Sequence, residues 1–156
     1  GFARNIARTA AGRSHPLLAG KPDGYAAICV HLDEIEVLPD GMTVLATNAV
    51  SDVQAAAWRS SDGRSRFWGV QYHPEYDFGQ IAAVIVRYGP ERLISEGFFR
   101  GRSDYDAYLA DLRTLQSRPD ATSEGWRHGL DASVTQRSLR ERELSNWLDA
   151  IGDARG

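Results

Sequence analysis

The sequence is poor in cysteine and lysine, and it has no long apolar run. Cys29 is the only cysteine and Lys21 the only lysine among the 156 residues. A single cysteine excludes an internal disulfide and fits a reducing compartment, so we expect a cytoplasmic protein. No apolar stretch approaches the roughly 20 residues of a membrane-spanning helix, so we expect no membrane association.

A concentrated positive charge is also lacking. The 18 basic residues are outnumbered by 21 acidic ones, and the net charge is −3. Because the arginines are spread along the chain between acids, the sequence does not predict a nucleic-acid partner. In the C-terminal region Arg137, Arg140 and Arg142 alternate with Glu141 and Glu143. This mixed run predicts a solvated helix face.

The apolar residues of the first half of the chain occur in short runs that are typical of strands. They predict five strands, over residues 24–31, 35–38, 43–48, 53–59 and 66–72. An Asp-Gly pair lies within residues 60–65, between the last two runs. Asp-Gly is typical of tight turns, so we expect a hairpin there.

After residue 76 the apolar spacing changes from strand-like to helical. The pattern predicts helices over 77–88, from Ser103 to about 115, and over 133–151, with a polar linker over 117–125. The fold class is therefore predicted to be α/β, with a first domain over 1–100 and a helical extension over 101–156.

The most informative stretch is "FWGVQYHPEYD" (67–77), in which an apolar strand ends in His-Pro-Glu. Pro74 removes a backbone donor and ends the strand, and it biases His73 towards an extended conformation. Glu75 can then turn back to the imidazole and fix its tautomer, so that the other ring nitrogen can act as a general base. The alternative is a polar pair at a strand end with no catalytic role.

The motif "GVQYHPE", together with the upstream "HLDEIEVLPDGMTVLATN", resembles the class I glutamine amidotransferases. Within that family the sequence is most similar to stand-alone proteins akin to the amidotransferase domain of GMP synthase. The two motifs occur in the family's order and cover roughly residues 24–88. The resemblance implies part of a flavodoxin-like doubly wound sheet, glutamine or a glutamine-like amide as substrate, and no cofactor.

The resemblance also implies roles for individual residues. His73 would be the general base and acid, and Glu75 would orient it. Backbone groups of Val30, His31 and Leu32 would help to hold the substrate. In the family a cysteine attacks the side-chain carboxamide of glutamine, a thioester forms, ammonia leaves, and water regenerates the enzyme.

The nucleophile of the family is absent from this sequence. Its cysteine lies in a Gly-x-Cys-x-Gly elbow between a strand and a helix, and no such elbow occurs here. We expect the elbow to lie N-terminal to Gly1, in a segment that also supplies the first strands of the sheet. Cys29 lies in the apolar run "AAICVH" and is interpreted as a buried structural thiol. The isolated chain should therefore lack glutaminase activity.

A sheet that lacks its first strands exposes an unpaired edge. The expected partners are the missing segment, a second copy of the chain, or a synthase that accepts the ammonia. Two other functions stay open. One is a catalytically inactive, amidotransferase-like binding module whose helical tail docks on a partner. The other is a metal-dependent hydrolase that uses His31, Asp33, His73 and Glu75 as ligands.

Overall fold

The computed structural model of the protein describes residues 1–153, and the chain divides into two units. The first unit contains Gly1–Glu75 and the described residues from Asp131 onwards; the second contains Tyr76–Leu130. The structural division after Glu75 differs from the predicted domain boundary at residue 100. That boundary concerns the extent of the family domain, and it stays a prediction. The two units are described separately below.

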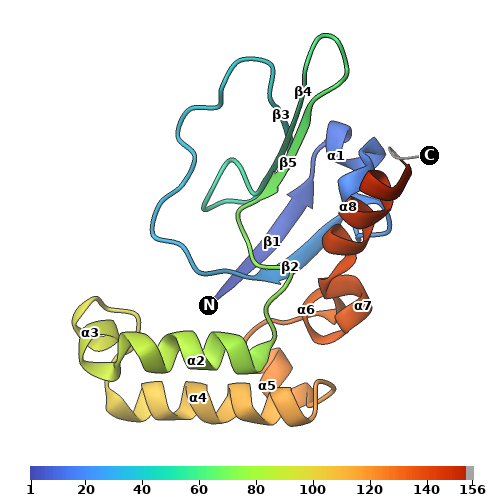
Figure 1. The fold of residues 1–156 in the computed structure, drawn as a ribbon. Coiled ribbons are helices and arrows are strands. Elements are labelled where there is room, and N and C mark those ends of the chain that lie inside the picture. Colours follow the sequence, from blue (N-terminus) through green and yellow to red (C-terminus); the bar gives the residue numbers. More distant parts are fainter. Residues whose placement is uncertain (154–156) are drawn as a thin grey trace. The chain divides into compact units, whose positions relative to one another are not determined.

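The first unit is built on a five-stranded sheet with the order β2-β1-β3-β4-β5 (Figure 1). The strands are β1 (Phe2–Arg8), β2 (Gly24–Ile28), β3 (Thr43–Thr47), β4 (Ala55–Arg59) and β5 (Arg66–Val70). All four pairings are antiparallel.

The predicted class, mixed α/β, is confirmed, but these strands do not form a doubly wound parallel sheet. A parallel pair needs a crossover of about a dozen residues or more, commonly a helix. Only residues 48–54 separate β3 from β4, and residues 60–65 separate β4 from β5. These connections suit antiparallel neighbours, and the predicted hairpin over 60–65 is confirmed, with Gly63 at a φ of 70°.

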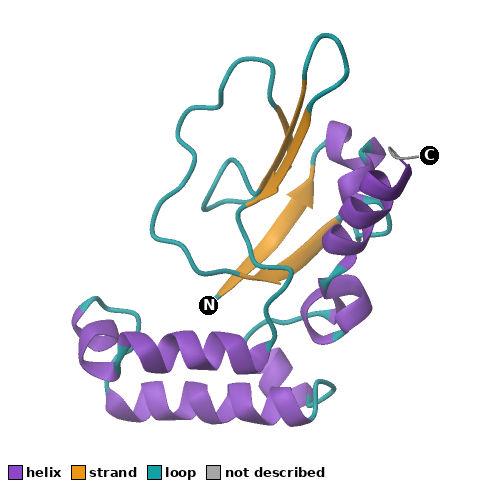
Figure 2. Ribbon diagram, in the orientation of Figure 1, coloured by secondary structure: helices purple, strands orange, loops and turns teal. Residues whose placement is uncertain are grey.

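One strand was missed by sequence reasoning and another was wrongly predicted. β1 carries two arginines, Arg4 and Arg8, which hide its alternation, yet Ile6 is fully buried and the strand lies between β2 and β3 in the sheet. A bulge interrupts its register, and Asn5 adopts a φ of 55° there. By contrast, residues 29–42 contain no helix or strand (Figure 2), and Val37 is exposed.

Helices at both ends of the chain complete the first unit. α1 (Ala10–Ser14) and the 3-10 turn η1 (Pro16–Leu18) follow β1. In place of the single helix predicted over 133–151, the chain forms α6 (Ala132–Thr135), α7 (Arg137–Arg140) and α8 (Arg142–Asp153).

The break between α6 and α7 falls at Gln136, which is extended, with φ −95° and ψ 116°. α8 then docks on η1 through Asn146, whose Nδ2 donates to the carbonyls of Leu17 and Ala19, both at 2.9 Å. The C-terminal helices of the chain are therefore part of the sheet unit.

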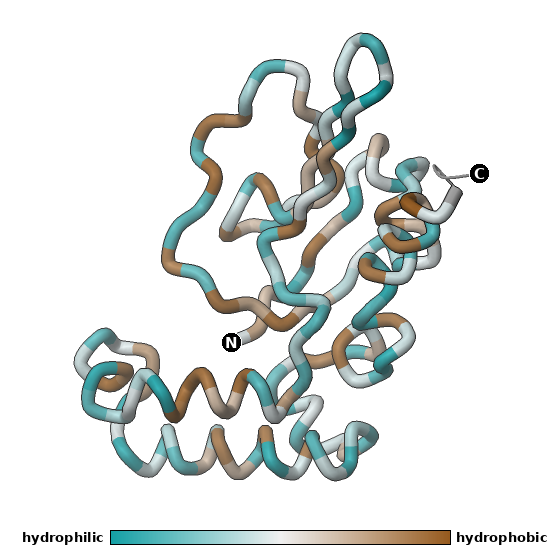
Figure 3. The backbone as a smooth tube through the Cα atoms, viewed as in Figure 1, coloured by the Kyte–Doolittle hydropathy of each residue, from teal (hydrophilic) through white to brown (hydrophobic). Residues whose placement is uncertain are grey.

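The second unit is helical and contains α2 (Phe78–Tyr88), α3 (Pro90–Ser95), α4 (Arg102–Ser117) and α5 (Thr122–Arg127). The helices predicted over 77–88 and from Ser103 are confirmed, and apolar residues recur along α2 (Figure 3). α5 falls largely within the predicted linker. α2 begins with a capping box between Asp77 and Gln80. Within residues 1–153, no helix is both long and apolar enough to cross a membrane.

Candidate functional site

The candidate site is built on Gln71–His73, which follows β5 and is called the closing segment here. The backbone N–H of Gln71 donates to the carbonyl of Gln54, at 2.9 Å, and so prolongs the pairing of β5 with β4. Two residues later, the N–H of His73 donates to the carbonyl of Ile28, at 2.7 Å. Ile28 ends β2, the strand at the opposite edge of the sheet. The closing segment therefore bonds to strands from both sides of the sheet, and this fixes the backbone of His73.

The side chains of His73 and Glu75 are in direct contact. Nδ1 of His73 lies 2.7 Å from Oε1 of Glu75, and the two side chains are 29% and 48% exposed. An ionised carboxylate can only accept a hydrogen bond, so Nδ1 carries the proton and donates it. In the neutral ring the lone pair is then on Nε2. This is the geometry that a base and its orienting carboxylate require, whereas the catalytic roles themselves stay a prediction.

The predicted substrate-binding loop, Val30–Leu32, is tied to the closing segment by Gln71. Nε2 of Gln71 donates to the carbonyl of Asp33, at 2.7 Å, and lies 3.4 Å from Nδ1 of His31. Nδ1 of His31 itself lies 2.8 Å from the same carbonyl. Sequence reasoning missed Gln71. The only indication in the sequence was that Gln71 is polar, whereas its neighbours at the end of the predicted strand are mostly apolar.

Cys29 follows β2 and is half-buried. Its backbone N–H donates to the carbonyl of Gly1, at 2.9 Å, in continuation of the pairing between β1 and β2. Burial raises the pKa of the Cys29 thiol, so near neutral pH the sulfur stays protonated and is a poor nucleophile. These features support the interpretation of Cys29 as a structural thiol.

The ligand set of the metal-dependent hydrolase is not assembled. Across residues 1–153, no three His, Cys, Asp or Glu side chains lie in a group that could hold a metal ion. His31 and Asp33 meet through a backbone carbonyl, whereas His73 and Glu75 meet through their side chains. The four residues therefore do not form one metal site, and this alternative loses its structural basis.

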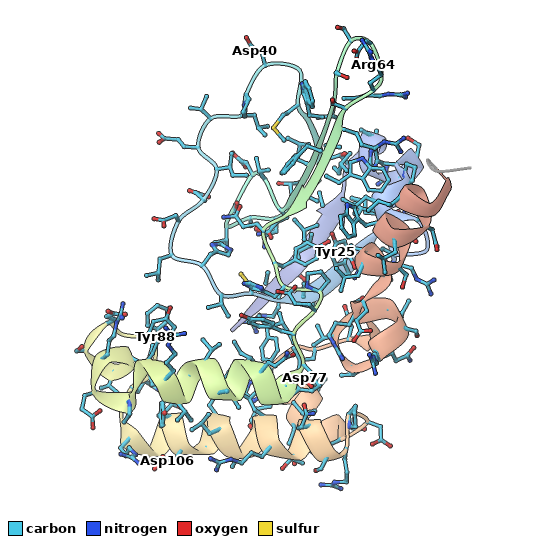
Figure 4. All side chains as sticks on the ribbon, in the orientation of Figure 1. Tyr25, Asp40, Arg64, Asp77, Tyr88 and Asp106 are labelled. Carbon is cyan, nitrogen blue, oxygen red and sulfur yellow. The ribbon has the colours of Figure 1, made fainter. Side chains whose placement is uncertain are left out.

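Beneath the closing segment lies a buried polar cluster that sequence reasoning missed. Nζ of Lys21 lies 3.0 Å from Oε1 of Glu143, and the two side chains are 1% and 2% exposed. The hydroxyl of Tyr72 donates to the same carboxylate oxygen, at 2.6 Å, and lies 2.9 Å from the hydroxyl of Tyr25 (labelled in Figure 4). The Lys21 ammonium also donates to the carbonyl of Leu139, at 3.0 Å.

The predicted solvated helix face is therefore wrong for Glu143 and also for Arg140, which is buried and donates to a backbone carbonyl. Burial raises the pKa of the Tyr72 phenol well above its ordinary value, and the neighbouring Glu143 carboxylate adds to this shift. Burial lowers the pKa of Lys21, and the pairing with Glu143 opposes that shift. The buried cluster thus contains four titratable side chains, those of Lys21, Tyr25, Tyr72 and Glu143, of which Tyr72 belongs to the closing segment.

Comparison with known proteins identifies the family. The profile of the family described as glutamine amidotransferase class-I matches residues 4–88, more than half of the chain. The chain belongs to this family. The match covers most of β1, the other four strands, the loop over 29–42, the closing segment and α2. The observed contact between His73 and Glu75 thus lies inside the region that the family profile matches.

The curated relatives differ in the share of this chain over which they are similar to it. A gamma-glutamyl-L-1-hydroxyisopropylamide hydrolase from a Pseudomonas species is 29% identical over 150 residues, which are 96% of this chain and 50% of the relative. The glutamine-hydrolyzing GMP synthase of Thermomicrobium roseum is 36% identical over 73 residues, which are 47% of this chain and 13% of the relative. The chain spans about half the length of the first relative and much less of the second.

Proposed function

We propose that this chain supplies the base and the orienting carboxylate for hydrolysis of a γ-glutamyl amide, with His73 as general base and acid and Glu75 as its partner. The observation that carries this proposal is the 2.7 Å contact between Nδ1 of His73 and Glu75. It lies within a motif of the class-I amidotransferase family. The same contact leaves Nε2 as the basic nitrogen of the neutral ring.

The proposed chemistry is that of the class I amidotransferases, with these residues in the roles that the resemblance implies. A cysteine thiol gives its proton to Nε2 of His73, and the thiolate attacks the amide carbon of the γ-glutamyl group. Protonated His73 returns the proton to the leaving amine, and a thioester remains. His73 then takes a proton from water, which attacks the thioester, and returns that proton to the leaving thiolate, so that glutamate and the free thiol are released. We propose that this cysteine lies in a Gly-x-Cys-x-Gly elbow outside the 156 residues, because Cys29 has neither the elbow nor the lowered pKa that the step requires.

The coverage of the relatives supports simple amide hydrolysis over ammonia transfer to a synthase. The Pseudomonas amide hydrolase is similar to the chain over 150 residues, including its C-terminal helices. A GMP synthase of Nitrosomonas eutropha is similar over 132 residues, but these are 24% of its length. A GMP-synthase-type amidotransferase with a synthase partner is therefore the second candidate function.

The test measures hydrolysis of glutamine and of small γ-glutamyl alkylamides by the protein that carries both the elbow and this chain. His73→Gln should lower kcat by about 10²–10⁴-fold, which is the usual contribution of a general acid–base residue. Glu75→Gln should lower it by a smaller factor, because its half-exposed carboxylate is screened by water. Glu91→Gln, an exposed carboxylate on α3, is the matched control and should leave kcat unchanged.

The results separate the candidate functions. Equal activity of the wild type and the His73→Gln variant would refute the proposed role of His73. Activity on glutamine that rises only when a synthase is added would favour the second candidate. A protein with the elbow in place and no hydrolysis of any of these amides would support the inactive binding module.

A further inference from the structure

We propose that Glu143 of α8 is a positioning residue for His73, and that it acts through the hydroxyl of Tyr72. This inference rests on the proposed function of His73. It gives the C-terminal helix a role in positioning His73, although α8 lies outside the region that the family profile matches.

The connection consists of three contacts. Oε1 of Glu143 accepts from the Tyr72 hydroxyl at 2.6 Å and lies 3.0 Å from Nζ of Lys21. The Tyr72 hydroxyl also lies 2.9 Å from that of Tyr25 on β2. Hydrogen bonds to a charged acceptor are shorter and stronger than neutral ones. The end of the Tyr72 side chain is therefore held from two sides.

Tyr72 is covalently adjacent to His73, so its position limits that of the imidazole. Burial alternates along this stretch: Gln71 and His73 are partly exposed, whereas Tyr72 and Pro74 are buried. Neighbouring Cα atoms are held about 3.8 Å apart across a trans peptide, so a shift of the Tyr72 main chain also moves His73. A displacement of about 1 Å at a reacting group can lower the rate about a hundredfold.

A second anchor acts on the backbone. The N–H of His73 donates to the carbonyl of Ile28, at 2.7 Å, and this holds the backbone of the closing segment. The Tyr72 side chain supplies a further point of attachment, on the inner side of the closing segment. Together the two anchors set the direction from which the imidazole meets Glu75.

The main test is Tyr72→Phe, which keeps the ring and removes the hydroxyl. In the enzyme that carries the elbow, kcat should fall about tenfold to a hundredfold while KM stays unchanged, because orientation of the base is lost and not the binding of substrate. In the 156-residue chain, the NMR signals of the His73 ring should shift. The ring signals of His15, which packs on Trp68 elsewhere in the same unit, should not.

A second variant removes the acceptor and keeps the cluster free of unpaired charge. Lys21→Met with Glu143→Leu replaces a buried ion pair by apolar side chains of similar size, a change that folds are known to tolerate. It should reproduce the loss of kcat and the His73 shift of Tyr72→Phe. Asn146→Ala is the matched control, since it removes two hydrogen bonds of α8 without touching Tyr72.

The outcomes are decisive in both directions. The inference is supported if both cluster variants shift the His73 signals and lower kcat while Asn146→Ala does neither. It is overturned if the cluster variants behave as Asn146→Ala does, since α8 would then contribute stability alone. If the His73 signals shift but the wild-type enzyme hydrolyses no γ-glutamyl amide, positioning holds and the proposed function fails.

Discussion

The contribution of the buried Lys21–Glu143 ion pair to the free energy of unfolding of the first unit can be predicted and measured. Both side chains are almost fully buried, and their charged atoms are 3.0 Å apart. Removal of one partner of such a pair leaves an unpaired buried charge and typically costs about 3–5 kcal/mol. Such a loss is a substantial part of the total stability of a small domain, which is about 5–15 kcal/mol.

The perturbation is a double-mutant cycle of Lys21→Met, Glu143→Leu and the two together. Lys21→Met leaves the Glu143 carboxylate with the Tyr72 hydroxyl as its remaining donor, since Oε2 of Glu143 has no hydrogen-bond partner among residues 1–153. Glu143→Leu leaves the ammonium with the carbonyl of Leu139 and the ring of Tyr25. Each single variant should lose about 3–5 kcal/mol, and the double variant should lose much less than either.

Hydrogen exchange at the amides of β2 and α8 is the appropriate assay, because the chain has two units and a single unfolding transition cannot be assumed. Exchange in α4, which belongs to the second unit, serves as the internal control. If the losses of the two single variants simply add in the double variant, the two charges are not coupled, and the reasoning from burial is refuted.

Three further predictions concern other parts of the first unit. Gly12→Ala places a methyl group against the carbonyl oxygen of Leu45 in β3, closer than van der Waals contact allows, and should cost at least about 1–3 kcal/mol in the hydrogen exchange of the first unit. Gly24→Ala, which has nothing within 4 Å of the added methyl group, should cost nothing, and equal losses in the two variants would contradict this. A diazo-ketone analogue of glutamine should leave Cys29 unlabelled in intact-mass measurements at neutral pH, because burial raises the pKa of its thiol, and stoichiometric labelling would disprove the structural interpretation. Burial raises the pKa values of Tyr25 and Tyr72, so their contribution to stability is complete below pH about 10 and is lost as the pH rises above it. An alkaline absorbance titration should show that these two phenols ionise at higher pH than the exposed tyrosines. This high-pH step should disappear in the Tyr25→Phe, Tyr72→Phe double variant, and its persistence would count against the assignment.

Features that depend on neighbouring residues could be predicted from the sequence. His73 and Glu75 are two residues apart with a proline between them, so their contact follows from local backbone geometry. Helices such as α2 were predictable for the same reason, because their apolar spacing and capping residues lie within one short stretch.

Features that depend on distant residues could not be predicted. Glu143 lies in a run of charges that is typical of a solvated helix, and only the fold places it against Lys21, far away in the sequence. β1 was missed because its arginines mask the strand pattern, although it lies between β2 and β3 and its Ile6 is buried. Apart from the hairpin over 60–65, the direction of the strands was also mispredicted. The prediction of a doubly wound sheet was taken from the family resemblance, whereas the short connections between the strands favour antiparallel pairs.

The attachment of Tyr72 to α8 has a consequence for biosynthesis. A ribosome that has translated the chain through Glu75 has already made the complete His-Pro-Glu motif, but not the helix that carries Glu143. Until α8 emerges and docks, the Tyr72 hydroxyl lacks its charged acceptor. A nascent chain should therefore hold His73 in a poorly defined position until the sheet unit is whole, and the activity proposed for this residue would begin only late in synthesis.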